Sequence, residues 1–376
     1  MTIRPYRSYV EISRRQIASN YQNLRAAVGD DVEVLGVVKA DAYGHGAVEV
    51  SRVLEAEGAR WLAVSSVEEG VNLRRAGLSA RILVLAGFLK EEREALVEYD
   101  LTPALHSIED MVEINRLACS AGHGIRYHLK IDSGMARMGT RAAAEQIVGA
   151  LRETPHAILE GLMTHFASAA DFGSPQTEQQ LSCFEELARK LSQAGFAPAY
   201  LHLASTNAVA YGRRGTWHHM VRPGHAIYGY VSPARGEAQR PIFEVQPVLT
   251  WKAKILLTKD VPAGTLIGYG GSFRTPRAMR LGVLSVGYAD GYPHRLSNKG
   301  KVIAGGRWAP ITGTVSMDLT TVDLTQSPQL APGDEVTLLG REGELSLGAI
   351  EMARTAGTIS YHILSNISPR VHRVYV

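Results

Sequence analysis

The stretch VLGVVKADAYGHG, residues 34–46, says most about the fold of this chain. An apolar run of the kind that forms a buried strand ends in Lys39, and a Gly-His-Gly turn at residues 44–46 then opens a helical pattern. A lysine at the buried end of a strand is costly unless its amine has a use. The commonest use is as a desolvated amine that forms a Schiff base with a carbonyl group. On this segment alone, an ordinary surface lysine at a strand end stays an open alternative.

Outward from this stretch, short β-like runs alternate with helical patterns through the first two-thirds of the 376 residues. Helices are predicted at residues 91–99, 108–121 (with a stop at Gly122) and 178–194. Eight strands alternating with helices are typical of a (β/α)8, or TIM-like, barrel. A doubly wound open sheet is the alternative, but no convincing Gly-rich phosphate loop occurs early in the chain. The strands are predicted at residues 34–39, 61–65, 81–87, 102–106, 127–131, 159–165, 200–205 and 221–228.

The character of the sequence changes past about residue 235, where prolines, glycine turns and β-rich segments dominate. We therefore predict two domains. Residues 1–235 form the α/β barrel, with the first ten or so residues able to pack on the second domain, and residues 236–376 form a mostly β domain. Within the second domain, strands are predicted at 249–258, 280–287, 335–340 and 371–376, and helices near 347–354 and 361–365.

Composition and charge argue against several classes of protein. Hydrophobic residues make up 45% of the chain and charged residues 20%, as in a globular protein. The formal net charge of +3 does not suggest a nucleic-acid or membrane partner, and no apolar run approaches the roughly 18 residues of a membrane span. Cys119 and Cys183 are far apart and lack a metal-type spacing. We expect both to be buried reduced thiols, which favours the cytoplasm.

Polar residues fall where the predicted barrel strands end. Barrel enzymes place their chemistry at the C-terminal ends of the strands and bind phosphates after strands 7 and 8. Each residue also has a structural interpretation: His165 could be a core histidine, Ser205 a helix cap and Arg222 a solvated arginine. The convergence of independent segments on one rim favours the functional interpretation. Those segments are Lys39, 130–137, 164–166, 205–207 and 222–224.

A metal site is not predicted. His218 and His219, with His202 and His225, are the obvious candidate ligands, but their spacing fits no standard zinc pattern and no carboxylate accompanies them locally.

Taken together, these segments resemble the bacterial alanine racemase family over nearly the whole chain. The resemblance implies a fold-type III pyridoxal 5'-phosphate enzyme that works as a head-to-tail homodimer on a small amino-acid substrate and supplies D-alanine for peptidoglycan. Several long motifs occur in the family's order: VVKADAYGHG (37–46), KIDSGMARMG (130–139), THFASA (164–169), RPG (222–224) followed by IYG (227–229), GYGG (268–271), GYADGY (287–292), GTVSMD (313–318) and RVHRVY (370–375).

The resemblance assigns roles to residues that bind the cofactor. Lys39 matches the lysine that forms an aldimine with pyridoxal phosphate, and Arg222 matches the donor to its pyridine nitrogen, with His165 ordering Arg222. Arg137 matches the ligand of the phenolic oxygen and of the substrate carboxylate, and Lys130 matches a lysine that is carbamylated in many members. The remaining cofactor ligands implied by the resemblance are Tyr43, Ser205, Gly224, His225 and Tyr361.

Racemisation needs a base on each face of the substrate Cα. The resemblance implies Lys39 for one face and Tyr269, supplied by the partner subunit, for the other. A tyrosine is a poor base unless its neighbours lower its pKa from about 10. Without the resemblance, Tyr269 would be interpreted as a turn aromatic or an interface anchor. Met317 and Asp318 match substrate-binding positions at the mouth of the partner's site.

Three positions depart from the family pattern, namely Ala204, His225 and His362, and they leave the details of substrate scope open. The main hypothesis is interconversion of L- and D-alanine. The alternatives are a serine, lysine or broad-specificity racemase, a diamino-acid decarboxylase and a non-catalytic cofactor carrier. The decarboxylase ranks low because neither Cys119 nor Cys183 lies in the C-terminal domain, where those relatives carry a catalytic cysteine.

Overall fold

The computed structural model describes residues 6–376, which form two compact units. The barrel unit consists of Ile17–Ala42 and Ala47–Gln246. The β unit consists of the chain up to Gln16, Tyr43–Gly46 and Pro247–Val376. Residues 1–5, part of the N-terminal segment expected to pack on the second domain, lie outside the described residues. No helix in the described part of the chain is both long enough and apolar enough to cross a membrane.

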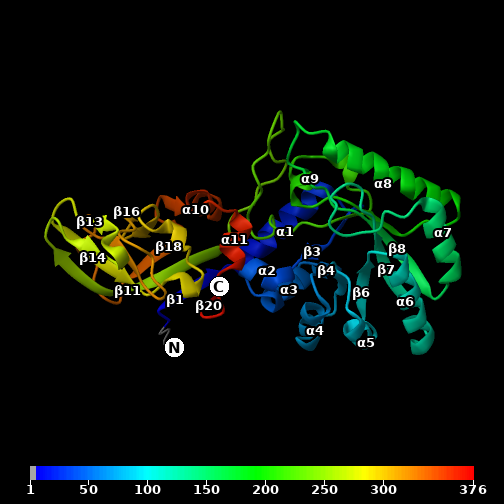
Figure 1. The fold of residues 1–376 in the computed structure, drawn as a ribbon, viewed down its shortest axis with the longest axis horizontal. Helices are drawn as coiled ribbons and strands as arrows, with labels where there is room; N and C mark the ends of the chain where they lie inside the picture. The colour runs from blue at the N-terminus through cyan, green and yellow to red at the C-terminus, as the bar shows by residue number, and fades with distance from the viewer. Residues whose placement is uncertain (1–5) are drawn as a thin grey trace. The chain divides into compact units, whose positions relative to one another are not determined.

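The barrel unit is built around parallel strands that follow one another in chain order (Figure 1). β10 (Met220–Val221) pairs in parallel with β2 (Glu33–Val34), which directly precedes the first strand of the main sheet. The Arg222 N–H donates to the Ala204 carbonyl at 2.9 Å, which links the end of β10 to the segment after β9 and closes the ring. This arrangement confirms the predicted α/β barrel. The main sheet contains β3 (Gly36–Val37), β4 (Trp61–Val64), β5 (Arg81–Val84), β6 (Leu101–Leu105), β7 (Ile125–Lys130), β8 (Ala157–Met163) and β9 (Tyr200–His202).

Helices cover the outer side of these strands (Figure 1), which explains why β4 is apolar along its whole length. Every residue of β4 and of β6 is buried. Helix α6 (Ile108–Ala121) has the predicted bounds, because Ser107 accepts the Asp110 N–H at 3.0 Å and Gly122 ends the helix at φ +74°. The other helices are α1 (Arg14–Val28), α3 (Ala47–Ala56), α4 (Val67–Arg75), α5 (Arg93–Glu98), α7 (Ala144–Glu153), α8 (Gln176–Gln193) and α9 (Thr206–Ala210).

Several expectations from the sequence are wrong in this unit. The strands predicted at 34–39, 81–87 and 200–205 end earlier, at Val37, Val84 and His202. The strand predicted at 221–228 ends at Val221, because Pro223 has no N–H to donate and the Gly224 N–H bonds to the Thr206 hydroxyl at 3.1 Å instead. Cys119 on α6 and Cys183 on α8 are free but exposed, since both lie on the faces of these helices turned away from the sheet.

The β unit is organised by the long strand β11 (Leu249–Val261), whose first residues alternate between buried and half-buried. β1 (Ser8–Ile12) pairs antiparallel with β11 and parallel with β20 (His372–Tyr375). Helices α10 (Ala349–Ala356) and α11 (Ser360–Ser365) complete the unit. The unit is mostly β, as predicted. Its other strands are β12 (Leu266–Ile267), β13 (Phe273–Arg274), β14 (Met279–Leu284), β15 (Lys301–Ala304), β16 (Arg307–Pro310), β17 (Thr320–Asp323), β18 (Glu335–Glu342) and β19 (Leu345–Leu347).

Gly291 is expected to be indispensable to the β unit. Its φ is +93°, and an added Cβ would lie 2.0 Å from the Asn366 carbonyl oxygen, so that backbone would have to move. We expect Gly291→Ala to lower the free energy of unfolding by about 3 kcal/mol or more. Gly333→Ala is the matched control, because φ is +98° but nothing lies within 4 Å. The free energy of unfolding of that variant, measured by urea denaturation, should fall by only about 1 kcal/mol. If the two variants lost the same free energy of unfolding, the close approach of the added Cβ to Asn366 would have no energetic cost.

Candidate active site

Lys39 opens a left-handed helical turn, α2 (Lys39–Gly44). Four residues that are not glycine have left-handed backbones there: Ala40 at φ 53°, Asp41 at 51°, Ala42 at 53° and Tyr43 at 55°. Each residue in such a turn costs roughly 1–2 kcal/mol, so the surroundings must impose the conformation. The strand ends at Val37, and Lys39 therefore follows it rather than belonging to it.

Carboxylates of the barrel unit hold this turn in place. Glu69 on α4 accepts the Ala40 N–H through Oε1 and the Ser65 N–H through Oε2, both at 2.6 Å. Asp41 Oδ1 accepts the Ala47 N–H at 2.8 Å. These bonds fix the backbone on both sides of the turn and so set the direction in which Lys39 leaves the strand.

The amine of Lys39 is in an environment that favours its neutral form. Burial lowers the pKa of Lys39, and Arg137 and Arg222 lower it further, while Glu69 opposes them. A neutral amine is the nucleophilic form of lysine. Lys39 is therefore suited to bond with a carbonyl carbon.

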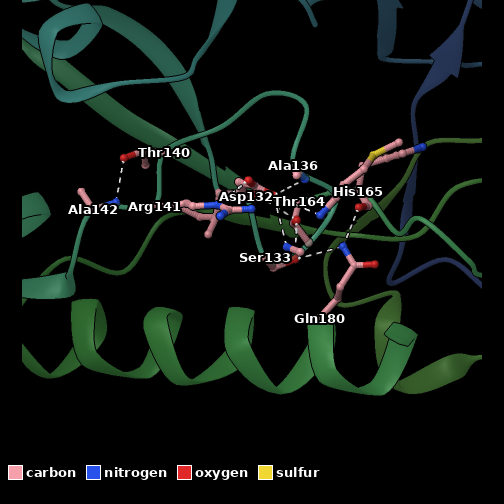
Figure 2. Close-up of polar contacts among 12 residues, drawn as sticks. Asp132, Ser133, Ala136, Thr140, Arg141, Ala142, Thr164, His165 and Gln180 are labelled. Carbon is pink, nitrogen blue, oxygen red and sulfur yellow. Dashed lines mark hydrogen bonds and ion pairs between the residues drawn. The ribbon is translucent and has the colours of Figure 1, made fainter. Parts of the chain in front are cut away.

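The loop after β7 carries Arg137 and is shaped by Asp132 (Figure 2). Asp132 Oδ1 accepts the N–H groups of Gly134, Met135 and Ala136 at 3.2, 3.0 and 2.9 Å, and Oδ2 accepts from Arg141 Nε at 2.6 Å. Burial raises the pKa of Asp132, but the bonds from Ala136 and Arg141 outweigh it and lower the pKa overall. The carboxylate thus organises the turn that presents Arg137 to solvent.

Gln180 on α8 joins this loop to the one after β8 (Figure 2). Its amide donates to the Ser133 hydroxyl at 3.4 Å and to the His165 carbonyl at 3.0 Å. Ser133 and Thr164 also share a hydrogen bond of 2.8 Å. The segments that carry Arg137 and His165 are therefore held in a fixed relation within the barrel unit.

Asp132→Ala is expected to lower the free energy of unfolding at neutral pH by about 1–3 kcal/mol, because three backbone N–H groups and Arg141 lose a charged acceptor. The contribution is present above the ordinary carboxyl pKa and is lost as the pH falls through the lowered pKa of the folded state. Urea denaturation at neutral and acid pH would measure both effects. Asp132→Asn retains an acceptor oxygen and should lose less. An Asp132→Ala variant as stable as the parent would contradict this account of the loop.

Lys130 lies at the end of β7, within electrostatic range of the same groups. Burial lowers its pKa to about 8, and Arg222 and Arg137 contribute to the shift. Lys39, Lys130, Arg137 and Arg222 thus form a cationic cluster in the barrel unit. Such a cluster is suited to binding anions.

Arg222 is buried and faces histidines. Its Nη1 donates to His202 Nδ1 at 2.9 Å and its Nη2 lies 3.4 Å from His165 Nδ1. It also donates to the backbone carbonyls of His202, Thr164 and Leu203. Burial lowers the pKa of Arg222 to about 9, and burial together with Arg222 lowers the pKa of His165 to about 3. At neutral pH, Arg222 is therefore charged and His165 is neutral.

The segments after β9 and β10 supply small polar groups. Ser205 is the N-cap residue of α9, yet its side chain makes no capping hydrogen bond, so its hydroxyl is available to a ligand. Gly224 is buried and donates its N–H to Thr206. Of the departures from the family pattern, Ala204 is buried, His225 stacks on Tyr230 with ring centroids 5.1 Å apart, and His362 bonds to Asn366 at 2.8 Å.

The remaining predicted residues belong to the β unit. Tyr43 and Tyr361 have ring centroids 5.9 Å apart, and burial, then Tyr361, raises the pKa of Tyr43. Tyr269 is 77% exposed and Met317 is 53% exposed. Asp318 forms an ion pair with Arg370 at 2.9 Å. The exposed pair Tyr269 and Met317 is thus accessible to another molecule.

The sequence did not identify two buried histidines that belong to the Arg222 environment. His202 was considered only as a metal ligand, and His128 was not considered. His202 contacts both Arg222 and His128. The only signal in the sequence was that both residues lie in predicted strands, at positions where an apolar side chain is usual.

Comparisons with known proteins cover both domains. The profile "Alanine racemase, N-terminal domain" matches residues 12–233, and "Alanine racemase, C-terminal domain" matches residues 248–375. The alanine racemase of Halothermothrix orenii is 39% identical over 98% of this chain and 96% of its own length. That of Symbiobacterium thermophilum is 40% identical over 98% and 97%.

Solved structures agree. Alanine racemase from Streptomyces coelicolor has a TM-score of 0.92 at 35% identity and covers 98% of each chain. The enzyme from Bartonella henselae, with covalently bound pyridoxal phosphate, has a TM-score of 0.88 at 27% identity and covers 99% of this chain and 100% of that one. The resemblance seen in the sequence motifs is confirmed: the chain belongs to the alanine racemase family of amino-acid isomerases.

Proposed function

We propose that the chain is an alanine racemase that interconverts L- and D-alanine with pyridoxal phosphate by a two-base mechanism. The observation that carries the proposal is the position of Lys39 beside the cations Arg137 and Arg222, in a chain that is similar to proteins named alanine racemase. A depressed lysine pKa beside arginines is the chemistry that a cofactor aldehyde and phosphate require.

The residues present fit the cofactor. Lys39 offers the amine, Arg137 and Arg222 offer permanent positive charge, and Ser205 offers a hydroxyl without a capping bond at the phosphate end of the barrel. The chemistry that the cofactor supplies when bound is the withdrawal of electrons from the substrate Cα. The residues that we propose to hold it are Lys39, Tyr43, Arg137, His165, Ser205, Arg222, Gly224, His225 and Tyr361.

Arg222 would donate a hydrogen bond to the pyridine nitrogen of the cofactor without giving up its proton. Its pKa stays near 9 even after burial, so it remains a cation at neutral pH. A donor that keeps its proton leaves the pyridine ring less electron-withdrawing than an acid would, which limits side reactions such as transamination. The neutral His165 beside Arg222 fixes its orientation.

Lys39 exchanges a proton with one face of the substrate Cα, and Tyr269 of a second copy exchanges a proton with the other. The 77% exposure of Tyr269 supports a role outside its own subunit. Arg137, Met317 and Asp318 bind the substrate carboxylate and line its approach. We also propose that Lys130 is carbamylated, since its pKa of about 8 provides the neutral amine that reacts with carbon dioxide.

We further propose that the active form is a head-to-tail homodimer in the cytoplasm, where it supplies D-alanine for peptidoglycan. Exposed apolar side chains of the β unit support the dimer. Leu266 and Leu319 lie on the segments that carry Tyr269 and Met317, and Leu257 lies on β11.

The test is exchange of the Cα proton in deuterated buffer. The purified protein is incubated with L-alanine, L-serine or L-lysine, and exchange is followed by NMR with chiral analysis of the products. Exchange on alanine with appearance of the D-enantiomer is expected. Preferential turnover of serine or lysine would show that alanine is not the main substrate. Bound cofactor without exchange of the Cα proton would show that the protein is a non-catalytic cofactor carrier.

A further inference from the structure

Arg222 is a buried cation whose hydrogen-bond partners are histidine rings and backbone carbonyls. A buried charge normally requires an opposite charge. In this structure the opposite charge is a carboxylate that lies across the interior of the barrel unit and does not contact Arg222 directly.

A chain of side chains connects Arg222 to a glutamate on β8. Arg222 Nη1 lies 2.9 Å from His202 Nδ1, and His202 Nε2 lies 2.8 Å from His128 Nδ1. His128 Nε2 makes no hydrogen bond of its own and lies 3.5 Å from Glu160 Oε2, so this last link is an electrostatic contact. Arg81 binds the same carboxylate through both oxygens, at 2.7 and 2.6 Å. His128 and His202 are fully buried, so water does not interrupt the chain.

The chemistry of the donors gives this chain a single direction. A guanidinium can only donate, so His202 Nδ1 must accept and His202 Nε2 must carry the proton. The N–H at His202 Nε2 donates a hydrogen bond to His128 Nδ1. His128 Nδ1 is therefore an acceptor, and His128 Nε2 carries the proton and faces the carboxylate. Both rings are therefore neutral Nε2–H tautomers, and their dipoles are aligned between Arg222 and Glu160.

We infer that Glu160 is a positioning residue for racemisation, acting through the aligned tautomers of His128 and His202 to hold the Arg222 guanidinium in place. The part of this inference that concerns turnover rests on the proposed function, and the part that concerns the tautomers does not. Glu160 supplies negative charge without standing beside Arg222, where a carboxylate would compete with the pyridine nitrogen of the cofactor for the same guanidinium.

The environment of each member supports this arrangement. Burial lowers the pKa of both histidines, which favours the neutral form of each ring, while Glu160 acts in the opposite direction on His128. Burial raises the pKa of Glu160, but the nearby His128 ring and the hydrogen-bonded Arg81 outweigh it and bring the pKa to about 2, so the carboxylate is ionised. The rings of Trp61 and Tyr200 lie 5.3 and 6.0 Å from His128 and fix its plane.

The first test reads the tautomers directly. The holoenzyme, labelled with 15N in its 13 histidines, is studied by long-range 1H–15N NMR, with His128→Gln and His202→Gln spectra used for assignment. We expect both residues to be neutral with the proton on Nε2. A proton on Nδ1 of either ring, or a charged ring at neutral pH, overturns the inference whether or not the protein racemises alanine.

The second test measures turnover. Glu160→Gln retains the size and an acceptor oxygen but removes the charge, and we expect kcat to fall roughly 2- to 30-fold with little change in KM. Glu113→Gln is the control, because Glu113 forms a half-buried ion pair with Arg93 on the helices α5 and α6. The control should retain full kcat. Unchanged kcat in Glu160→Gln, or an equal fall in both variants, overturns the role of Glu160 even if the tautomers are as expected.

Discussion

Replacing Lys39 by alanine is expected to abolish racemisation, with kcat at least about 10³-fold lower in both directions. The amine of Lys39 has two roles in the proposed mechanism, as the attachment point of the cofactor and as the base for one face of the substrate, and alanine removes both. Chiral chromatography of the products measures the rate, and the visible absorbance of the lysine-bound cofactor should disappear at the same time.

Lys90→Ala is a suitable control for this variant, since Lys90 is an exposed lysine of the barrel unit away from the cationic cluster. It should keep both the rate and the absorbance. If Lys39→Ala kept more than about a tenth of the parental rate, well above the residual expected for loss of an essential base, Lys39 could not be the base.

Tyr269→Phe is expected to slow racemisation by about 10²- to 10⁴-fold, because the hydroxyl is the proposed base for the second face. Lys39 remains in this variant, so one enantiomer of alanine should still exchange its Cα proton with deuterated buffer without changing its configuration. This combination of exchange with little inversion is specific to the loss of one of two bases. Proton NMR and chiral analysis of the same sample separate the two rates.

The exposure of Tyr269 makes this variant easy to interpret. At 77% exposure, loss of the hydroxyl should change the free energy of unfolding by no more than about 0.5 kcal/mol. A fall in rate therefore cannot be attributed to unfolding. Full racemisation by Tyr269→Phe would eliminate Tyr269 as a base and leave it as an interface side chain.

The barrel could be predicted because its strands and helices obey local rules. Strand β4, for example, is buried on both faces and reads as a continuous apolar run. The end of α6 follows from a glycine in the left-handed conformation. The strand predicted at 221–228 was too long because the apolar run continues past Pro223, and the proline, not hydrophobicity, decides where the pairing of β10 stops.

The turn after Lys39 could not be predicted, because Ala40–Tyr43 would ordinarily adopt a right-handed helix. Its left-handed form depends on Glu69, which is distant in sequence and contacts the turn only in the folded barrel. The histidine chain escaped prediction for the same reason. His128 and His202 are 74 residues apart and lie on strands separated by β8, and no local pattern marks such a pair. The strand-end residues were identified because the barrel brings all strand ends to one rim.

The pairing of β1 has a consequence for how the protein is made. Ile12 pairs with Leu249 on one side, and Tyr9 pairs with His372 on the other. At a translation rate of about 5–20 residues per second, β1 leaves the ribosome roughly 10–50 s before its first partner exists. During that interval both edges of β1 are open to other strands or to chaperones. The second edge of β1 is covered only after His372–Tyr375 have been made, so the β unit is completed long after its first strand is synthesised.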